Sequence, residues 1–279
     1  MNAAPDSYGV VGHPVGHSLS PFIHGMFARE TGQSMSYRLY DVPAHELAGF
    51  ITRFFEQGGR GLNVTVPHKI AAAAAASELT PRATHAAAVN TLALRDDGTV
   101  LGDNTDGVGL VRDLCDNLGL VITRRRLLII GAGGATRGVL APLLGLSPTL
   151  VVIANRTPER SAALAAAFAD LGATQGLGFE DVGTEPFDVI INATSASLSG
   201  DMPPVPAAVV GRSTVCYDLA YGRAATAFVD WALAHGAARA LQGWGMLLEQ
   251  AAESFRLWRG IRPSTATVLA ALKERAANR

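Results

Sequence analysis

The most informative part of the sequence is Arg126-Leu127-Leu128-Ile129-Ile130-Gly131-Ala132-Gly133-Gly134-Ala135. Its first half is a continuous apolar run, which is typical of a strand buried on both faces of a parallel sheet. The glycines that follow permit a tight turn, and they let backbone N–H groups approach a pyrophosphate at the start of a helix. The stretch therefore predicts the first strand–turn–helix unit of a dinucleotide-binding domain.

Strand-like and helical patterns alternate along the rest of the chain, which predicts an α/β fold with largely parallel sheets. Expected strands are Tyr8–Gly12, Tyr37–Val42, Gly61–Val66, Thr91–Arg95, Arg126–Ile130, Leu150–Ala154, Asp188–Asn192 and Thr214–Leu219. Expected helices are Pro21–Glu30, Ala44–Gln57, Val108–Leu118, Thr136–Leu144, Glu159–Asp170, Ala225–His235, Met246–Trp258 and Ala266–Ala276. The run Ala71–Ala76 is a strong helix former, and Ser20 is expected to cap the first helix ahead of Pro21.

The composition narrows the class of protein. The chain has 279 residues, a hydrophobic content of 48% and a net charge of −1, so it shows no signature of a nucleic-acid partner. Its two cysteines stand far apart, and neither a leader pattern nor a membrane-spanning apolar run is present. His13, His17 and His24 lack a further ligand, so no metal site is expected. These features predict a soluble cytoplasmic protein without membrane or nucleic-acid partners.

One lysine is a candidate for chemistry. Of 23 basic residues only Lys69 and Lys273 are lysine, and the rest are arginine. A lysine ammonium can lose a proton when it is desolvated, whereas a guanidinium in effect cannot. Lys69 also follows an expected strand and the helix-entry residue Pro67. The alternative interpretation is a lysine without a role on a solvated helix start.

The end of the second strand of the nucleotide unit discriminates between cofactors. An NAD site usually carries Asp or Glu there, whereas this strand ends in Asn155-Arg156-Thr157, with Arg160 one turn later. Two arginines at this spacing can bind a 2′-phosphate through charge-assisted hydrogen bonds. The sequence therefore favours NADP over NAD, and a solvated helix face that carries both arginines is the alternative.

Four further segments carry polar groups at expected strand or loop ends, suited to the hydroxyls and carboxylate of a small polyol acid. They are Gly12–Pro21, Asn63–Lys69, Ala88–Thr91 and Gly102–Gly107. Each taken alone is compatible with a cap or a turn. A lysine and an aspartate among these polar groups can share a proton relay.

Together these motifs resemble one known family. Ser18-Leu19-Ser20-Pro21, Asn63-Val64-Thr65-Val66-Pro67-His68-Lys69, Asn90-Thr91, Gly102-Asp103-Asn104-Thr105-Asp106-Gly107, the glycine loop, Asn155-Arg156-Thr157 and Gly245-Met246-Leu247-Leu248-Glu249-Gln250-Ala251-Ala252 occur in the order and spacing of the shikimate dehydrogenases. The resemblance implies reversible, NADP(H)-dependent reduction of 3-dehydroshikimate to shikimate in aromatic amino-acid biosynthesis. It also implies an N-terminal α/β substrate domain completed by C-terminal helices, residues 1–105 plus 243–279, and a Rossmann-type doubly wound NADP-binding domain, residues 106–242.

The resemblance assigns residues by position. The expected catalytic pair is Lys69 and Asp106, and which of them donates the proton does not follow from sequence. Expected substrate contacts are Ser18, Ser20, Asn63, Thr65, Asn90, Tyr221 and Gln250. Expected cofactor contacts are Gly131, Ala132, Gly133, Gly134, Ala135, Asn155, Arg156, Thr157, Arg160, Leu219 and Gly243. Gly222–Thr226 departs from the proline-containing turn of many relatives, which leaves the contact of this loop with the nicotinamide open.

Two alternatives have their own signatures. The first is a relative that acts on quinate or another shikimate-like acid, often with NAD. Ser18, Thr65 and the pair Arg156 and Arg160 count against it, because they match the pattern for shikimate and NADP. An NADP-binding protein without activity would need the pocket but neither Lys69 nor Asp106. The family members are monomers or homodimers, and the sequence does not discriminate between these states.

Overall fold

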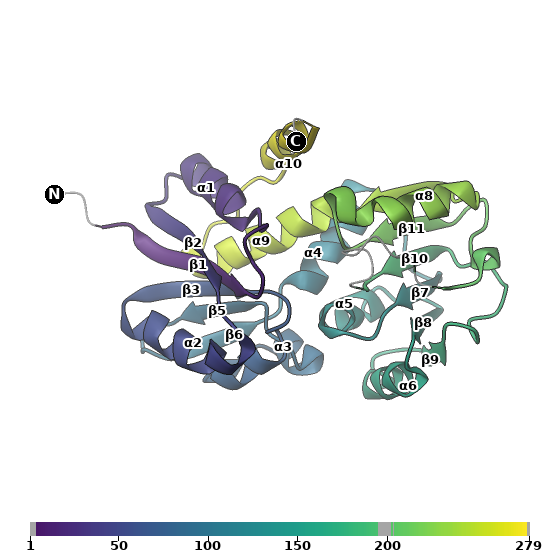
Figure 1. Cartoon of the computed structure of the whole chain (residues 1–279), viewed down its shortest axis with the longest axis horizontal. Coiled ribbons are helices and arrows are strands. Elements are labelled where there is room, and N and C mark those ends of the chain that lie inside the picture. Colours follow the sequence, from purple (N-terminus) through teal and green to yellow (C-terminus); the bar gives the residue numbers. More distant parts are fainter. Residues whose placement is uncertain (1–3, 195–201, 203, 278–279) are drawn as a thin grey trace. The chain divides into compact units, whose positions relative to one another are not determined.

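The computed structural model describes residues 4–194, 202 and 204–277, which form two compact units (Figure 1). One unit is Met1–Gly109 with Leu248–Arg279, and the other is Leu110–Leu247. Both boundaries fall inside helices, α4 (Asp106–Arg112) and α9 (Trp244–Arg259). Among the described residues, no helix is long and apolar enough to cross a membrane.

The first unit is built on a mixed sheet with the strand order β2-β1-β3-β5-β6-β4. The strands are β1 (Asp6–Gly12), β2 (Met35–Asp41), β3 (Gly59–Val64), β4 (Glu78–Leu79), β5 (Thr91–Leu94) and β6 (Val100–Asp103). Only β5 runs antiparallel to its neighbours, β3 and β6. Its direction follows from the tight turn before β6, where Gly98 adopts a φ of 83° that other residues rarely reach. The sheets are largely parallel, as expected, and the two pairings of β5 are the antiparallel exception.

Helices cover both faces of this sheet. They are α1 (Ser20–Thr31), α2 (Leu47–Glu56), α3 (Pro81–Ala86), α9 and α10 (Ala266–Ala277), with short 3-10 turns at Ala44–Glu46 and Ala71–Ala75. Leu47, Ile51 and Phe54 of α2 pack into one core with Leu62 and Val64 of β3. On α1 and α9, Phe27 and Phe255 meet edge to face at 5.8 Å between ring centroids.

Two local expectations fail in this unit. Ser20 does not cap α1: the helix begins at Ser20 itself, and the capping position is Leu19, which makes no side-chain bond. Pro67 does not begin a helix, because residues 65–70 form turns and the alanine run that follows makes only a 3-10 segment. Alanine favours a helix locally, but no α-helical turn adjoins this short segment from which a helix could propagate.

The second unit contains a parallel sheet with the order β12-β11-β10-β7-β8-β9, the doubly wound arrangement expected from the sequence. Its strands are β7 (Arg126–Ile130), β8 (Leu150–Asn155), β9 (Thr174–Gly178), β10 (Val189–Asn192), β11 (Val215–Asp218) and β12 (Arg239–Gln242). Its helical segments are Asp113–Asn117, α5 (Gly134–Leu144), α6 (Pro158–Ala167), Ala207–Val209, Gly222–Ala225 and α8 (Thr226–Ala234).

The apolar run of β7 is explained by burial on both faces. Leu127 and Ile129 belong to the core that contains α5 and α6, whereas Leu128 and Ile130 belong to the core that contains α8. Because successive side chains of a strand point to opposite faces, both registers of the strand must be apolar.

Four short strands, β4, β6, β9 and β12, were not expected from the sequence. β6 ends in Gly102 and Asp103, and β9 reads Thr-Gln-Gly-Leu-Gly, so neither has a strong apolar or β-branched pattern. Each of these strands pairs with a neighbour in the sheet, and this pairing compensates for a weak local preference.

Candidate active site

The direction of β5 gathers the polar residues of the first unit at one edge of its sheet. β3 and β6 run parallel to each other, so their carboxyl ends lie at the same edge, and the antiparallel β5 begins there. Lys69 follows β3, Asn90 immediately precedes β5, and Asp106 follows β6. Three residues that are distant in sequence therefore meet.

Lys69 and Asp106 form a direct ion pair. Nζ of Lys69 donates to Oδ2 of Asp106 at 2.5 Å, with the lysine side chain 18% and the aspartate side chain 6% exposed. The turn that carries Lys69 is fixed by its backbone carbonyl, which accepts the N–H of Val89 at 2.7 Å. The neighbouring ring of His68 is buried and its Nε2 lies 2.7 Å from the carbonyl oxygen of Val42.

Asn90 orients the carboxylate of Asp106. Its amide nitrogen donates to Oδ1 of Asp106 at 2.8 Å and to the hydroxyl of Thr105 at 2.9 Å. Its amide oxygen accepts the backbone N–H of Thr105 at 2.8 Å. Asn104 adds a further support, because its side-chain oxygen accepts the N–H of Asp106 at 3.2 Å. Each oxygen of Asp106 therefore has a hydrogen-bond donor, and the two contacts together fix the orientation of the carboxylate.

Asn63 lies beside Asn90, and its side-chain amide is held by hydrogen bonds to other residues of the protein. Its oxygen accepts the hydroxyl of Tyr37 at 2.7 Å, and its nitrogen donates to the hydroxyls of Ser254 at 3.0 Å and Thr91 at 3.1 Å. Burial raises the pKa of Tyr37, and a hydrogen bond with Ser20 opposes that shift. The sequence did not single out Tyr37 or Ser254, although Ser254 lies one helical turn after Gln250.

The remaining expected substrate contacts of this unit are partly exposed. The hydroxyls of Ser18 and Ser20 lie 3.1 Å apart, and the Ser18 oxygen accepts the backbone N–H of Ser20 at 3.3 Å. Thr65 is partly exposed, and its hydroxyl has no hydrogen-bond partner in the described parts of the chain. Gln250 is carried by α9, where its backbone lies against Gly109 of α4.

The glycine loop of the second unit connects β7 to α5. Gly131 has a φ of 108°, and a Cβ there would lie 3.2 Å from the backbone of Ala193, so this position requires glycine. At Gly133, which precedes α5, a Cβ would meet no described atom within 4 Å. A required turn followed by open backbone at a helix start fits the pyrophosphate of a dinucleotide.

Arg156 and Arg160 are exposed at the end of β8 and the start of α6. No ion pair of either guanidinium is found within the described residues. Asn155 fixes the turn between them, because its side-chain nitrogen donates to the carbonyl oxygen of Thr157 at 3.0 Å. Two uncompensated guanidinium groups next to a dinucleotide turn fit a 2′-phosphate.

Leu219, Tyr221 and Gly243 belong to the loops after β11 and β12. Gly243 donates its N–H to the carbonyl of Ala220 at 2.8 Å, and a Cβ at Gly243 would lie 2.5 Å from the carbonyl oxygen of Leu219. The ring of Tyr221 lies 4.8 Å from the indole of Trp244. The close approach of the two loops therefore requires glycine at position 243.

Comparison with family models identifies three consecutive parts of the chain. Residues 10–92 match the shikimate dehydrogenase substrate binding domain, residues 114–205 match shikimate / quinate 5-dehydrogenase, and residues 243–273 match the shikimate 5'-dehydrogenase C-terminal domain. These ranges include the Lys69 turn, the glycine loop and the Gln250 helix.

Individual relatives match over nearly the whole length. The shikimate dehydrogenase (NADP(+)) of Methylococcus capsulatus is 52% identical over 269 residues, which cover 96% of each chain. That of Aeromonas salmonicida is 53% identical over 268 residues, or 96% of this chain and 97% of the relative. The crystal structure of shikimate 5-dehydrogenase from Thermus thermophilus in complex with NADP(H) and shikimate is 33% identical and superposes with a TM-score of 0.85, covering 97% of this chain and 99% of that one. With this similarity, the same motifs and the same two-unit α/β fold, the chain belongs to the shikimate dehydrogenase (NADP(+)) family.

Proposed function

We propose that this chain is an NADP(H)-dependent shikimate dehydrogenase, which interconverts 3-dehydroshikimate and shikimate in aromatic amino-acid biosynthesis. The observation that carries the proposal is the ion pair of Lys69 and Asp106, with Asn90 on the second carboxylate oxygen, in a member of this family. A protein that only bound the dinucleotide would have no need of this pair.

The chemistry follows from charge. NADPH, when bound, supplies a hydride to the carbonyl carbon, and negative charge develops on the substrate oxygen. The Lys69 ammonium is the group of this site that can stabilise such an oxyanion. The pair of Lys69 and Asp106 can deliver the proton that completes the alcohol, and we assign proton transfer to the pair rather than to one member.

The proposal assigns binding roles to the residues around the pair. Ser18 and Ser20 bind the substrate carboxylate, and the substrate hydroxyls contact Asn63, Thr65, Asn90, Tyr221 and Gln250. Asn63 and Asn90 already hydrogen-bond within the protein, so their orientation is fixed before substrate arrives. Thr65 has a hydroxyl that is available to a ligand.

The cofactor roles rest on the second unit. The residues of the glycine loop, Gly131 to Ala135, bind the pyrophosphate, and Asn155, Arg156, Thr157 and Arg160 bind the adenosine phosphate. Leu219 and Gly243 contact the nicotinamide part. The proposal assigns substrate binding to residues 1–105 plus 243–279 and NADP binding to residues 106–242. It also includes a cytoplasmic location, consistent with two free cysteines, and a monomer or homodimer.

The test uses shikimate or quinate as substrate and NADP⁺ or NAD⁺ as oxidant. It follows the near-ultraviolet absorbance of the reduced nicotinamide that forms, NADPH or NADH. Rapid reduction of NADP⁺ by shikimate is expected, with much weaker activity in the other three combinations. A preference for quinate or NAD⁺ would retain the fold and the catalytic pair but contradict the proposed substrate or cofactor. Absence of turnover in protein that binds NADPH would contradict the proposed enzyme activity.

A further inference from the structure

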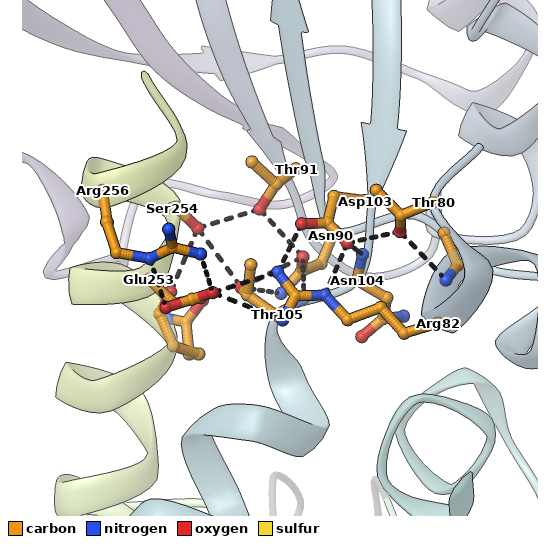
Figure 2. Close-up of polar contacts among 12 residues, drawn as sticks. Thr80, Arg82, Asn90, Thr91, Asp103, Asn104, Thr105, Glu253, Ser254 and Arg256 are labelled. Carbon is orange, nitrogen blue, oxygen red and sulfur yellow. Dashed lines mark hydrogen bonds and ion pairs between the residues drawn. The ribbon is translucent and has the colours of Figure 1, made fainter. Parts of the chain in front are cut away.

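Arg82 of α3 joins the buried carboxylates of Asp103 and Glu253 (Figure 2). Its Nε donates to Oδ1 of Asp103 at 2.6 Å and its Nη2 donates to Oδ2 at 2.5 Å, so the contact is bidentate. The same guanidinium donates to Oε1 of Glu253 at 3.2 and 3.3 Å. The side chains of Asp103 and Glu253 are 1% and 4% exposed, whereas that of Arg82 is 26% exposed.

Asp103 connects Arg82 to the residues that hydrogen-bond Asp106. Its carboxylate accepts the backbone N–H of Asn104 at 2.7 Å, and its backbone carbonyl accepts the N–H of Asn90 at 3.0 Å. Asn90 donates to the carboxylate of Asp106, and the side-chain oxygen of Asn104 accepts the backbone N–H of Asp106. The position of Asp103 therefore determines where both supports of Asp106 lie.

Glu253 lies on α9, so its contact with Arg82 connects Asp103 to that helix. The next residue, Ser254, is fully buried, and its hydroxyl lies 2.8 Å from that of Thr91 and 3.2 Å from that of Thr105 (Figure 2). Glu253 and Ser254 thus contact the same segment, one through Arg82 and the other directly. This helix also carries Gln250, a proposed substrate contact one turn earlier.

We propose that Arg82 is a positioning residue for the Lys69–Asp106 pair: by binding Asp103 and Glu253 together, it fixes the 103–106 segment against α9. Arg82 touches neither member of the pair in this structure, so it acts through Asp103, Asn90 and Asn104. The role in the reaction rests on the proposed function, whereas the positioning itself can be measured without turnover.

Lysine at position 82 is an informative substitution. Arg82→Lys retains a positive charge next to the two carboxylates, which favours folding, but it loses the planar fork that binds Asp103 through two parallel hydrogen bonds. The matched control is Arg259→Lys. Arg259 lies at the end of α9, is 17% exposed, and binds Asp6 and Gln33 away from the catalytic edge.

The first experiment compares steady-state kinetics of these two variants with those of the wild type, well below their melting temperatures. Arg82→Lys is expected to lower kcat about tenfold to a hundredfold, as expected for a small displacement of a catalytic group. The KM of Arg82→Lys for NADP⁺ should stay within about twofold of the wild-type value. The control variant Arg259→Lys should retain the wild-type kcat even if its Tm falls as much as that of Arg82→Lys. A kcat within about twofold of the wild type in Arg82→Lys would overturn the proposal.

The second experiment uses the two lysines of the chain. Competitive labelling with acetic anhydride, read by mass spectrometry, gives the reactivity of Lys69 relative to Lys273. Asp103→Asn retains the shape of the side chain but removes the charge that binds Arg82, and it should increase labelling of Lys69 because the amine is held less firmly by Asp106. Asp6→Asn, which removes the corresponding charge beside Arg259, should leave the ratio unchanged.

The two arms separate the two proposals. If the wild type does not oxidise shikimate, the proposed function fails, and the labelling arm still tests whether Arg82 and Asp103 position the pair. If Asp103→Asn folds and Lys69 labels as in the wild type, positioning through Asp103 is refuted, whatever the activity.

Discussion

Nζ of Lys69 and Oδ2 of Asp106 lie 2.5 Å apart, although 37 positions separate the two residues in the chain. The second oxygen of Asp106 is bound by Asn90, so the carboxylate cannot rotate without losing a charge-assisted hydrogen bond. Lys69 is therefore directed by a carboxylate that is itself fixed. Such second contacts hold a reacting group in place before substrate binds.

Replacement of Lys69 separates charge from proton transfer. Lys69→Ala removes both, and kcat is expected to fall by about 10² to 10⁴. Lys69→Arg retains the charge but cannot release a proton, so a loss of similar size is expected. Fluorescence titration should show NADPH affinity close to that of the wild type in both variants. A nearly normal kcat in Lys69→Ala would refute the catalytic role, and one in Lys69→Arg would leave only electrostatic stabilisation.

Asp106→Asn places an amide between two donors. Lys69 and Asn90 each donate to one oxygen of Asp106, whereas an amide has a single oxygen and must turn its NH₂ towards one of them. We expect kcat to fall at least about a hundredfold, with a loss of stability of about 1–3 kcal/mol from the unsatisfied contact. Thermal melting and steady-state kinetics measure the two effects. A large loss of Tm with unchanged kcat would show that Asp106 is structural.

The sequence predicted the nucleotide unit better than the catalytic surroundings, for a physical reason. β7 and the glycines after it can be recognised from consecutive residues. Burial on both faces requires an unbroken apolar run, and the tight turn requires glycine directly after it. β6 has no comparable local pattern, because two of its four residues are Gly102 and Asp103. It is stabilised as a strand by pairing with β5. The strand that contains Asp103 was consequently not predicted.

Contacts between distant segments were not readable from local pattern. Thr91 and Ser254 hydrogen-bond across 163 positions, and Arg82 and Glu253 across 171, so no local periodicity links them. Lys69 stood out because lysine is scarce in this chain, whereas its pairing with Asp106 was expected only because a family resemblance supplied it. Ser20 shows the converse: its hydroxyl fits a local capping rule, yet the helix begins one residue earlier than that rule requires.

Arg156 and Arg160 should determine the choice of cofactor. Arg156→Gln and Arg160→Gln each remove a proposed charge-assisted hydrogen bond to the 2′-phosphate, and the expected result is an increase of about tenfold to a hundredfold in the KM for NADP⁺. The KM for NAD⁺, which lacks that phosphate, should not rise. Arg212→Gln is a matched control, because Arg212 is exposed in the same unit but precedes β11, at the opposite end of a parallel strand. Equal effects on both cofactors would contradict the assignment.

His24 should make the stability of the protein sensitive to acid. Its ring is fully buried, stacks on Tyr37 at 4.3 Å between centroids, and has no hydrogen-bond partner for either nitrogen in the described part of the chain. Burial lowers the pKa of His24 from 6.5 to about 3, and the neighbouring Asn63 opposes this shift without making a hydrogen bond of good geometry to the ring. Between these values the unfolded chain binds a proton that the folded chain does not, so stability is lost as the pH falls below the unfolded value.

His24→Phe tests this consequence, because phenylalanine suits the aromatic surroundings and has no titrating group. Near neutral pH the variant should be at least as stable as the wild type, since it removes a polar ring without partners. At about pH 5 the wild type should have lost about 2 kcal/mol relative to the variant, because the unfolded pKa lies about 1.5 above that pH. Urea unfolding at the two pH values measures the difference. Parallel losses in both proteins would mean that His24 is protonated in the folded state and finds a partner there.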